Sequence, residues 1–227
     1  MRQEHFCLSC VSECSVFVSF DEHICEEHIG ELARMIRDNL STIVMNVIPS
    51  YRTILIDYLP FRITEKELLS TLNQIITLFD PKQSSHHPTK SIVIPVYYSE
   101  ETALDLPRFK QRGLSLESLV DAHTRSIYTV SAIGFAPGFA FLSDVEDELS
   151  MPRLETPRTH VPAGSVGIAD NKTAVYPAES PGGWNIIGRS PMHLFTDRPP
   201  FIPFNVGDSV TFLAISKQEF IDQGGKL

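Results

Sequence analysis

The sequence lacks the long hydrophobic runs, the excess of positive charge and the polar bias that define several classes of protein. Its 227 residues are 42% hydrophobic and 21% charged, whereas disordered chains are poorer in apolar residues and richer in charge. Its apolar stretches are interrupted or fall far short of the roughly 20 residues that a membrane-spanning helix needs. The 28 acidic and 19 basic residues give a formal net charge of −9, which repels phosphate backbones. We therefore expect a globular protein with neither a nucleic-acid nor a membrane partner.

Several common chemical signatures are also absent. The sequence has no G-x-x-x-x-G-K-[ST] phosphate loop, no G-x-G-x-x-G after a strand, no G-x-S-x-G nucleophile elbow and no H-E-x-x-H zinc helix. A nucleotide-binding Walker loop, a dinucleotide-binding fold and a serine-hydrolase elbow are therefore not indicated.

Cysteine is scarce, and its four positions are Cys7, Cys10, Cys14 and Cys25. Cys7 and Cys10 have the C-x-x-C spacing of metal sites, but no second such pair completes a four-ligand site. The N-terminal segment lacks the unbroken apolar core of a signal peptide, so we expect a cytoplasmic protein whose thiols stay reduced. We expect no bound metal and no disulfide, and we attribute Cys7, Cys10 and Cys14 to the packing of small apolar side chains in strands.

Glycine and proline divide the chain into two unlike parts. Residues 135–227 hold 9 of the 12 glycines and 10 of the 16 prolines, which is typical of short strands joined by ordered turns. Hydrophobic periodicity in the earlier part predicts strands at 6–11, 15–20, 43–48, 53–58 and 91–98, and helices at 21–40, from Thr64 onward, and at 115–125. The order β-α-β-β-α-β within these segments is typical of a ferredoxin-like layer. Residues 223–227 are expected to fray.

The most distinctive sequence lies at 134–142, GFAPGFAFL, and at 156–195, TPRTHVPAGSVGIADNKTAVYPAESPGGWNIIGRSPMHLF. Between Met151 and His193 the four basic and three acidic residues give a local charge of +1. Glycine- and proline-rich turns present N–H groups that bind anions, and arginine offers a planar fork to carboxylate or phosphate. The pattern indicates a site for a small anion, and basic turns without a ligand are the alternative.

The motifs GFAPGF, PRTHVPAGSVGIA, SPGGW and IGRSP resemble the family of the 5-oxoprolinase B subunit and KipI, whose members are also labelled allophanate hydrolase subunit 1 or carboxyltransferase domain, subdomain C and D. The resemblance is strong over residues 123–213 and weaker toward the N-terminus. It implies an α+β fold with a ferredoxin-like domain at 1–98 and a cyclophilin-like β-barrel domain, with a short leading helix, at 99–227. Two departures stand out: residues 99–106 lack the glycines of the usual GGEFGPDL, and Lys172-Thr173-Ala174 replaces Gln-Thr-Gly.

The resemblance also implies an activity and partners. In this family the B subunit pairs with a carboxyltransferase-like C subunit, and the pair acts with the A subunit, a third chain, to open 5-oxoproline to glutamate at the expense of ATP. We therefore expect one chain of a hydrolase that supplies half of a shared active site, is active only with its partners, and belongs to a complex that binds ATP on this chain or on another. The alternative is a KipI-like, non-catalytic inhibitor of a sensor histidine kinase.

The candidate site residues follow from matching the motifs position by position. The candidate catalytic residues are His123, Arg158, Lys172 and Arg189. The three cations are expected to bind the carboxylate or phosphate of a small anionic substrate, while His123 assists proton transfer or orients a partner. The candidate substrate-binding residues are Thr173, Tyr176, Ser180, Gly182, Gly183 and Trp184. Structural alternatives stay open for some of these residues. His123 is then a core histidine with its hydrogen bonds made inside the protein, Arg158 and Arg189 brace loops through backbone carbonyls, and Trp184 fills the hydrophobic core.

Overall fold

The computed structural model describes residues 5–22, 24–80 and 90–227. The chain forms two compact units that divide between Thr89 and Lys90, and each unit has its own hydrophobic core. Strand pairs are mostly antiparallel and helices are few, which confirms the mixed class of helices and sheets expected from the sequence. No helix within the described ranges is long and apolar enough to span a lipid bilayer.

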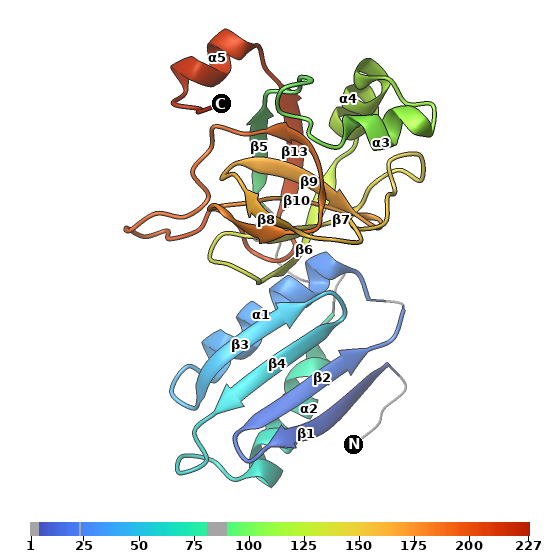
Figure 1. The fold of residues 1–227 in the computed structure, drawn as a ribbon. Coiled ribbons are helices and arrows are strands. Elements are labelled where there is room, and N and C mark those ends of the chain that lie inside the picture. The colour runs from blue at the N-terminus through green and yellow to red at the C-terminus, as the bar shows by residue number, and fades with distance from the viewer. Residues whose placement is uncertain (1–4, 23, 81–89) are drawn as a thin grey trace. The chain divides into compact units, whose positions relative to one another are not determined.

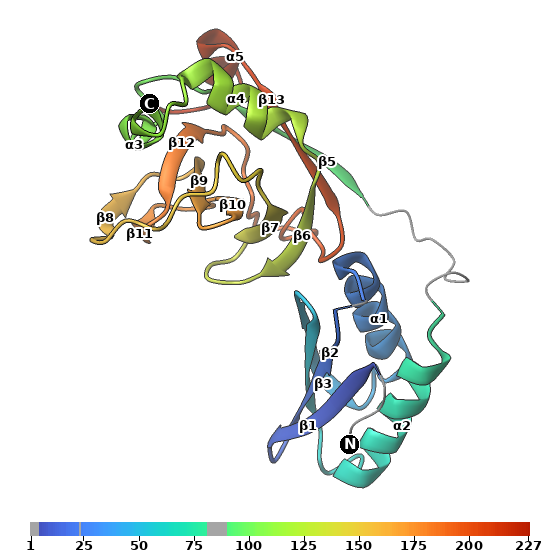
Figure 2. The same cartoon turned by 90° about the vertical axis from the view of Figure 1, so that its right-hand side faces the viewer.

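The first unit combines an antiparallel sheet with two helices (Figure 1). Its elements are β1 (Phe6–Ser12), β2 (Ser15–Phe20), α1 (Glu26–Asn39), β3 (Val44–Ser50), β4 (Thr53–Tyr58) and α2 (Glu65–Leu78). The strands lie in the order β1-β2-β4-β3, and both helices lie on the same side of the sheet (Figure 2). The core of this unit is the layer between sheet and helices.

Sequence periodicity explains these elements. In β4, Ile54, Ile56 and Tyr58 are buried and alternate with half-buried residues, as expected of a strand with one covered face. The capping box predicted at Thr64 is present, and α2 follows it directly. The helix predicted from residue 21 begins only at Glu26, because the N–H of Asp21 still donates to the carbonyl of His5 and so extends the hairpin of β1 and β2.

The second unit is built mainly from short strands. Its elements are β5 (Ser91–Val96), α3 (Leu106–Gln111), α4 (Leu116–Arg125), β6 (Tyr128–Ile133), β7 (Ala140–Asp144), β8 (Arg158–Val161), β9 (Ser165–Ala169), β10 (Lys172–Val175), β11 (Ser180–Gly182), β12 (Asn185–Arg189), β13 (Ser209–Ala214) and α5 (Lys217–Asp222). Strands β6-β7-β10-β9-β12 are joined in that order, β13 pairs with both β5 and β6, and β8 pairs with β11.

The strand predicted at 91–98 belongs to the second unit, not the first. It is β5, which runs parallel to β13 with Ser91 opposite Ser209. To complete a β-α-β-β-α-β layer it would have to lie beside β2, but β1 is paired at that edge. The division of the chain therefore falls before Lys90, earlier than the boundary expected after residue 98.

Alternation along the central strands of the second unit creates two separate cores. The larger one is formed with β5, β6, β13 and α4 and includes Val166, Ile168 and Val175. The smaller one lies on the opposite face of β9, β10 and β12 and consists of Phe139, Val161, Ala169, Ala174, Tyr176, Trp184 and Ile186. We call this smaller core, together with the face of β9, β10 and β12 that it covers, the Trp184 face. Because side chains alternate along a strand, neighbouring residues of β10 reach different cores.

Two short helices and the C-terminal segment differ from the sequence-based expectation. Neither α3 nor α5 was predicted, and α5 begins at a capping box formed by Ser216 and Glu219. The segment expected to fray is bonded instead: the N–H of Gly225 donates to Phe220, and the carbonyl of Lys226 accepts a hydrogen bond from Arg189.

Candidate functional site

Tyr176, Gly182 and Trp184 come together on the Trp184 face. Tyr176 is 1% exposed, and its ring packs edge-on against Phe139 with 5.4 Å between centroids. Gly182 lies so close to Tyr176 that a Cβ atom at this position would overlap the hydroxyl oxygen. Burial raises the pKa of Tyr176, although a backbone hydrogen bond from Trp184 and nearby arginines oppose the shift. The Tyr176 hydroxyl is therefore a neutral group held against the S-P-G-G-W segment.

The remaining residues of this segment form one side of the face. Trp184 is 5% exposed, with its ring 5.5 Å from that of Phe139 and the Arg153 guanidinium 5.9 Å from its centroid. The carbonyl of Gly183 accepts a hydrogen bond from the N–H of Leu154. The hydroxyl of Ser180 is buried without a hydrogen-bond partner among the described residues. Trp184 thus fills the core, as its structural alternative proposed, and contacts a cation at its ring.

Arg158 is fixed by a carboxylate that sequence reasoning left out of the site. Its Nη2 donates to Asp105 Oδ1 at 2.7 Å, and Asp105 is only 4% exposed. The other oxygen, Oδ2, accepts a hydrogen bond of 2.7 Å from the N–H of Ile186, and the N–H of Asp105 donates to the Ile186 carbonyl. Asp105 therefore binds the open edge of β12 and orients Arg158 at the same time, which supports the bracing alternative for this arginine.

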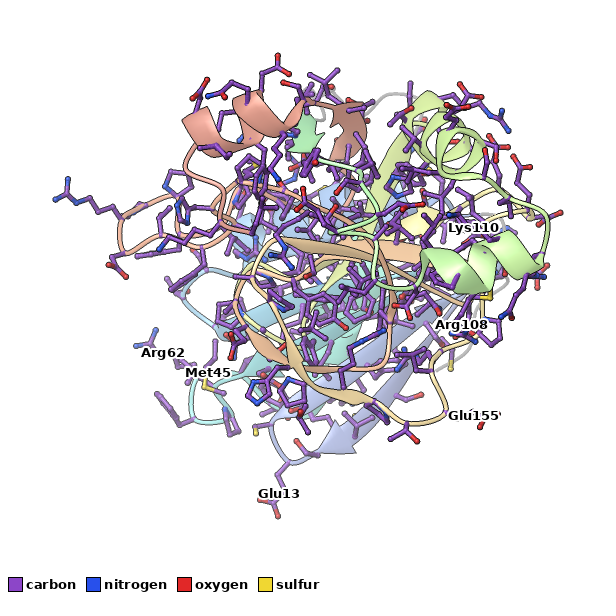
Figure 3. The ribbon with its side chains drawn as sticks, turned by 45° about the horizontal axis from the view of Figure 1, so that its top comes forward. Glu13, Met45, Arg62, Arg108, Lys110 and Glu155 are labelled. Carbon is purple, nitrogen blue, oxygen red and sulfur yellow. The ribbon has the colours of Figure 1, made fainter. Side chains whose placement is uncertain are left out.

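A second arginine and a buried amide continue this network. Arg108, on α3 (labelled in Figure 3), donates to Asn185 Oδ1. The Asn185 amide nitrogen donates to the carbonyls of Pro152 and Ile168 at 3.0 and 2.9 Å. Asp105 could have been identified because it is one of three residues in the 99–106 segment, with Glu101 and Leu106, that still match the usual GGEFGPDL. Asn185 and Arg108 carry no comparable signal.

His123 lies in the larger core, on the other side of β10 from the Trp184 face. It is fully buried, and its ring stacks on Phe212 with 4.2 Å between centroids. Its Nε2 lies 2.9 Å from Thr173 Oγ1, and its Nδ1 lies 2.7 Å from Tyr98 Oη. The Thr173 hydroxyl donates to the Gly167 carbonyl, so Thr173 accepts from Nε2–H and Tyr98 donates to Nδ1.

This chain of hydrogen bonds describes a neutral, satisfied histidine. Burial lowers the pKa of His123 to about 3, and both ring nitrogens are engaged within the protein. The structure therefore places His123 as the core histidine of its structural alternative. His123 contacts the candidate site through its hydrogen bond to Thr173, because the residues next to Thr173 in β10 point toward the Trp184 face.

A pH dependence of stability follows from this burial. Because the pKa of His123 is near 3 in the folded protein and near 6.5 in the unfolded chain, the unfolded chain binds the proton first as the pH falls. The contribution is complete above pH 6.5 and is lost progressively toward pH 3. We expect the free energy of unfolding to fall by about 2 kcal/mol between pH 7 and pH 5, measured by urea denaturation. The His123→Gln variant should lose this dependence and a variant of the exposed His160, His160→Gln, should keep it, whereas equal slopes in all three proteins would contradict the assignment.

The other two predicted cations have different surroundings. Lys172 forms an ion pair with Asp144 at one end of β10. Arg189, at the end of β12, is 8% exposed, and its Nη1 donates to the carbonyl of Lys226 at 3.1 Å. Burial lowers the pKa of the Arg189 guanidinium. Arg158, Lys172 and Arg189 thus contact different groups, which are Asp105, Asp144 and the carbonyl of Lys226.

The cysteines have surroundings other than those expected. Cys10 and Cys25 are exposed and Cys7 and Cys14 half-buried, so packing in a strand core does not account for them. In β1 only Phe6 and Leu8 reach the core. Within the part of the chain that the structure describes, no group of three or more His, Cys, Asp or Glu residues could hold a metal ion. The absence of metal and of disulfides stays a prediction.

Comparison with known proteins identifies the family. The profile of the carboxyltransferase domain, subdomain C and D, matches residues 6–203. The chain therefore belongs to this family. Among solved structures, the urea carboxylase of Kluyveromyces lactis superimposes with a TM-score of 0.71 at 15% identity, over 96% of this chain and 22% of that protein, which shows a shared fold.

Curated relatives within the family are named as the B subunit of 5-oxoprolinase, and the chain is a member of this B-subunit group. The Bacillus subtilis protein is 37% identical over 71% of this chain, the Haemophilus influenzae protein 39% identical over 67%, and the Escherichia coli O157:H7 protein 33% identical over 83%. The matched regions span 65%, 71% and 85% of these relatives. The crystal structure of TTHA0988 superimposes with a TM-score of 0.76 at 32% identity, over 89% of this chain and 40% of that one.

Proposed function

We propose that this chain is the B subunit of an ATP-dependent 5-oxoprolinase complex, which opens 5-oxoproline to glutamate, and that it supplies half of a shared active site. The observation that carries the proposal is its similarity to three relatives of that name, at 33–39% identity over most of the chain. The Trp184 face supports it, because this surface combines cations, a neutral tyrosine hydroxyl and a buried indole ring.

The proposal includes the partners and the finer fold. A carboxyltransferase-like C subunit and the A subunit complete the enzyme in the cytoplasm, and ATP is a substrate of the complex, with no contact assigned to a residue of this chain. The first unit is taken to be a variant of the ferredoxin-like layer in which β1 occupies the edge beside β2. The second unit is taken to be a cyclophilin-like barrel.

Within this proposal the site residues have distinct tasks. The cations Arg158, Lys172 and Arg189 give the Trp184 face its attraction for an anionic substrate. Tyr176 and Ser180 offer hydroxyl groups, while Gly182, Gly183 and Trp184 shape the surface on which the substrate lies. In this arrangement His123 takes no proton from the substrate. It positions β10 from the side of the larger core, through its hydrogen bond to Thr173.

Reconstitution tests the proposed function. We expect the isolated chain to show no 5-oxoproline-dependent hydrolysis of ATP, because its cationic face lacks a nucleotide-binding motif and is half of a site. Mixing the chain with the C and A subunits should restore hydrolysis, measured as released phosphate together with glutamate. Omission of this chain from the mixture is the control. Robust turnover by the isolated chain, or full turnover without it, would contradict the proposal.

Inhibition of a sensor histidine kinase is the competing role. It is not favoured, because the curated relatives are named for the hydrolase.

A further inference from the structure

Arg189 is a buried cation without a carboxylate partner among the described residues. It is 8% exposed. No Asp or Glu oxygen within the described ranges lies within 4.0 Å of its guanidinium nitrogens, the limit for an ion pair. Its Nε is buried and has no hydrogen-bond partner among the residues that the structure describes, while its Nη1 donates to the carbonyl of Lys226. A carbonyl group supplies a partial negative charge, and an uncompensated buried guanidinium is costly. The position therefore calls for an anion.

Ser165 adds a second unpartnered group beside this arginine. Ser165 is fully buried, and its hydroxyl has no hydrogen-bond partner in the described part of the chain. It is the Cα partner of Arg189 where β9 and β12 pair, so both side chains point to the same face, with Cβ atoms about 4.5–5.5 Å apart. That face is the Trp184 face, since Gly167 and Ile186 form the preceding pair on it. Buried hydroxyls without partners are rare in folded proteins.

The backbone holds this pair in place. Gly164, which precedes Ser165, has a φ of +78°, and a Cβ atom there would overlap the carbonyl oxygen of Ser190 and lie 3.4 Å from Arg189 Cγ. The N–H of Gly164 donates to Tyr176, and the N–H of Ser190 donates to Gly164. The two unpartnered groups therefore stand on closely packed, hydrogen-bonded strands.

The other two cations of the face are already neutralised. Arg158 is paired with Asp105 at 2.7 Å, and Lys172 is paired with Asp144. Arg158 keeps a buried Nη1 that has no partner in the described ranges, but Asp105 balances its charge. Of these three cations, Arg189 is the one whose positive charge no carboxylate of the described residues balances.

We propose that Arg189 and Ser165 together bind one anionic group of the substrate, a carboxylate or a phosphate, with Arg189 Nε and Ser165 Oγ donating to its oxygens. Arg158 and Lys172, which are paired with carboxylates, add to the positive charge of the face without contacting this anionic group. The inference rests on the proposed function for the identity of the substrate and adds Ser165 to its binding residues. Entry of the anion requires the Lys226 carbonyl to move away from Arg189.

Binding of simple anions to the full-length chain tests this inference. The probes are 5-oxoproline and inorganic phosphate as sodium salts, titrated by calorimetry against sodium chloride at equal ionic strength. The wild-type chain should bind at least one probe, and tighter binding of 5-oxoproline or of phosphate assigns the group as carboxylate or phosphoryl. Ser165→Ala and Arg189→Lys should each weaken binding about tenfold or more, the loss expected for one hydrogen bond to a charged group.

A structural role is distinguished by thermal stability. Removing an unpartnered buried hydroxyl should leave the melting temperature of Ser165→Ala unchanged or raise it. The matched control is Ser143→Ala on β7, which removes a hydroxyl that accepts a hydrogen bond from the N–H of Thr129. The control should lower the melting temperature and leave anion binding intact.

Three results would overturn the inference. They are the absence of binding of either probe, equal binding by wild type and both site variants, and a melting temperature that falls in Ser165→Ala as much as in Ser143→Ala. Because this chain is measured alone, such a failure would leave the hydrolysis of the reconstituted complex untouched. Conversely, a complex without hydrolysis would not remove the anion site.

Discussion

Replacing His123 by alanine is expected to lower the free energy of unfolding of the second unit by about 4 kcal/mol. The substitution empties the space of a fully buried ring that stacks on Phe212 and packs against Tyr128. It also removes the hydrogen-bond partner of Tyr98 Oη and one of the two partners of Thr173 Oγ1. Cavity formation and unpaired buried hydroxyls act in the same direction, so the loss should exceed that of either alone.

Chemical denaturation of the full chain measures this loss, with His160→Ala as the matched control. His160 is an exposed histidine on β8 whose ring meets Glu179 at the surface, so its removal should change stability by less than about 0.5 kcal/mol. If His123→Ala were as stable as the control, or if it kept its stability and lost only the activity of the complex, the packing role would be refuted in favour of a chemical one.

Asp105→Ala is expected to destabilise the second unit by about 3 kcal/mol. The substitution leaves the N–H of Ile186 without an acceptor at the edge of β12 and leaves Arg158 without its counter-ion. The Arg158 side chain is 28% exposed, so solvent screens part of the second effect. The backbone hydrogen bond at the strand edge should therefore account for much of the loss.

Two further variants separate these contributions. Asp105→Asn keeps an oxygen that can accept from Ile186 and removes the charge, so it should lose about half as much stability as the alanine variant. Asp147→Ala removes an exposed carboxylate from the turn after β7 and should be close to neutral. Denaturation midpoints of the three variants test the assignment, which would fail if Asp105→Ala behaved like Asp147→Ala.

Local patterns in the sequence were enough for elements whose partners are close in the chain. β2 and β4 have the predicted bounds because strict alternation marks one covered face, and α2 follows its capping box at Thr64. The partner of β5 could not be inferred in this way, since β13 follows it more than a hundred residues later. The same limit applies to Asp105, whose contacts are set by the packing of β12 against a distant loop.

The candidate site was predicted as a set of residues and not as an arrangement. The motifs identified Tyr176, Gly182 and Trp184, which share one face, but also Thr173, which alternation turns to the other side of β10. No motif distinguished a cation with a counter-ion from one without. That distinction depends on Asp105 and Asp144, which lie far from Arg158 and Lys172 in the sequence.

The parallel pairing of β5 with β13 has a consequence for synthesis on the ribosome. The strand pairs β1-β2, β2-β4 and β3-β4 all form between residues of the first unit, so this unit can fold while the rest of the chain is still being made. The sheet of the second unit cannot be completed until residues 209–214 have left the ribosome, because its first strand, β5, pairs with its last strand, β13. Until then β5 exposes an apolar strand edge, and the long loop that must close makes this step slow. The nascent second unit is thus the part of this protein that most needs protection from aggregation.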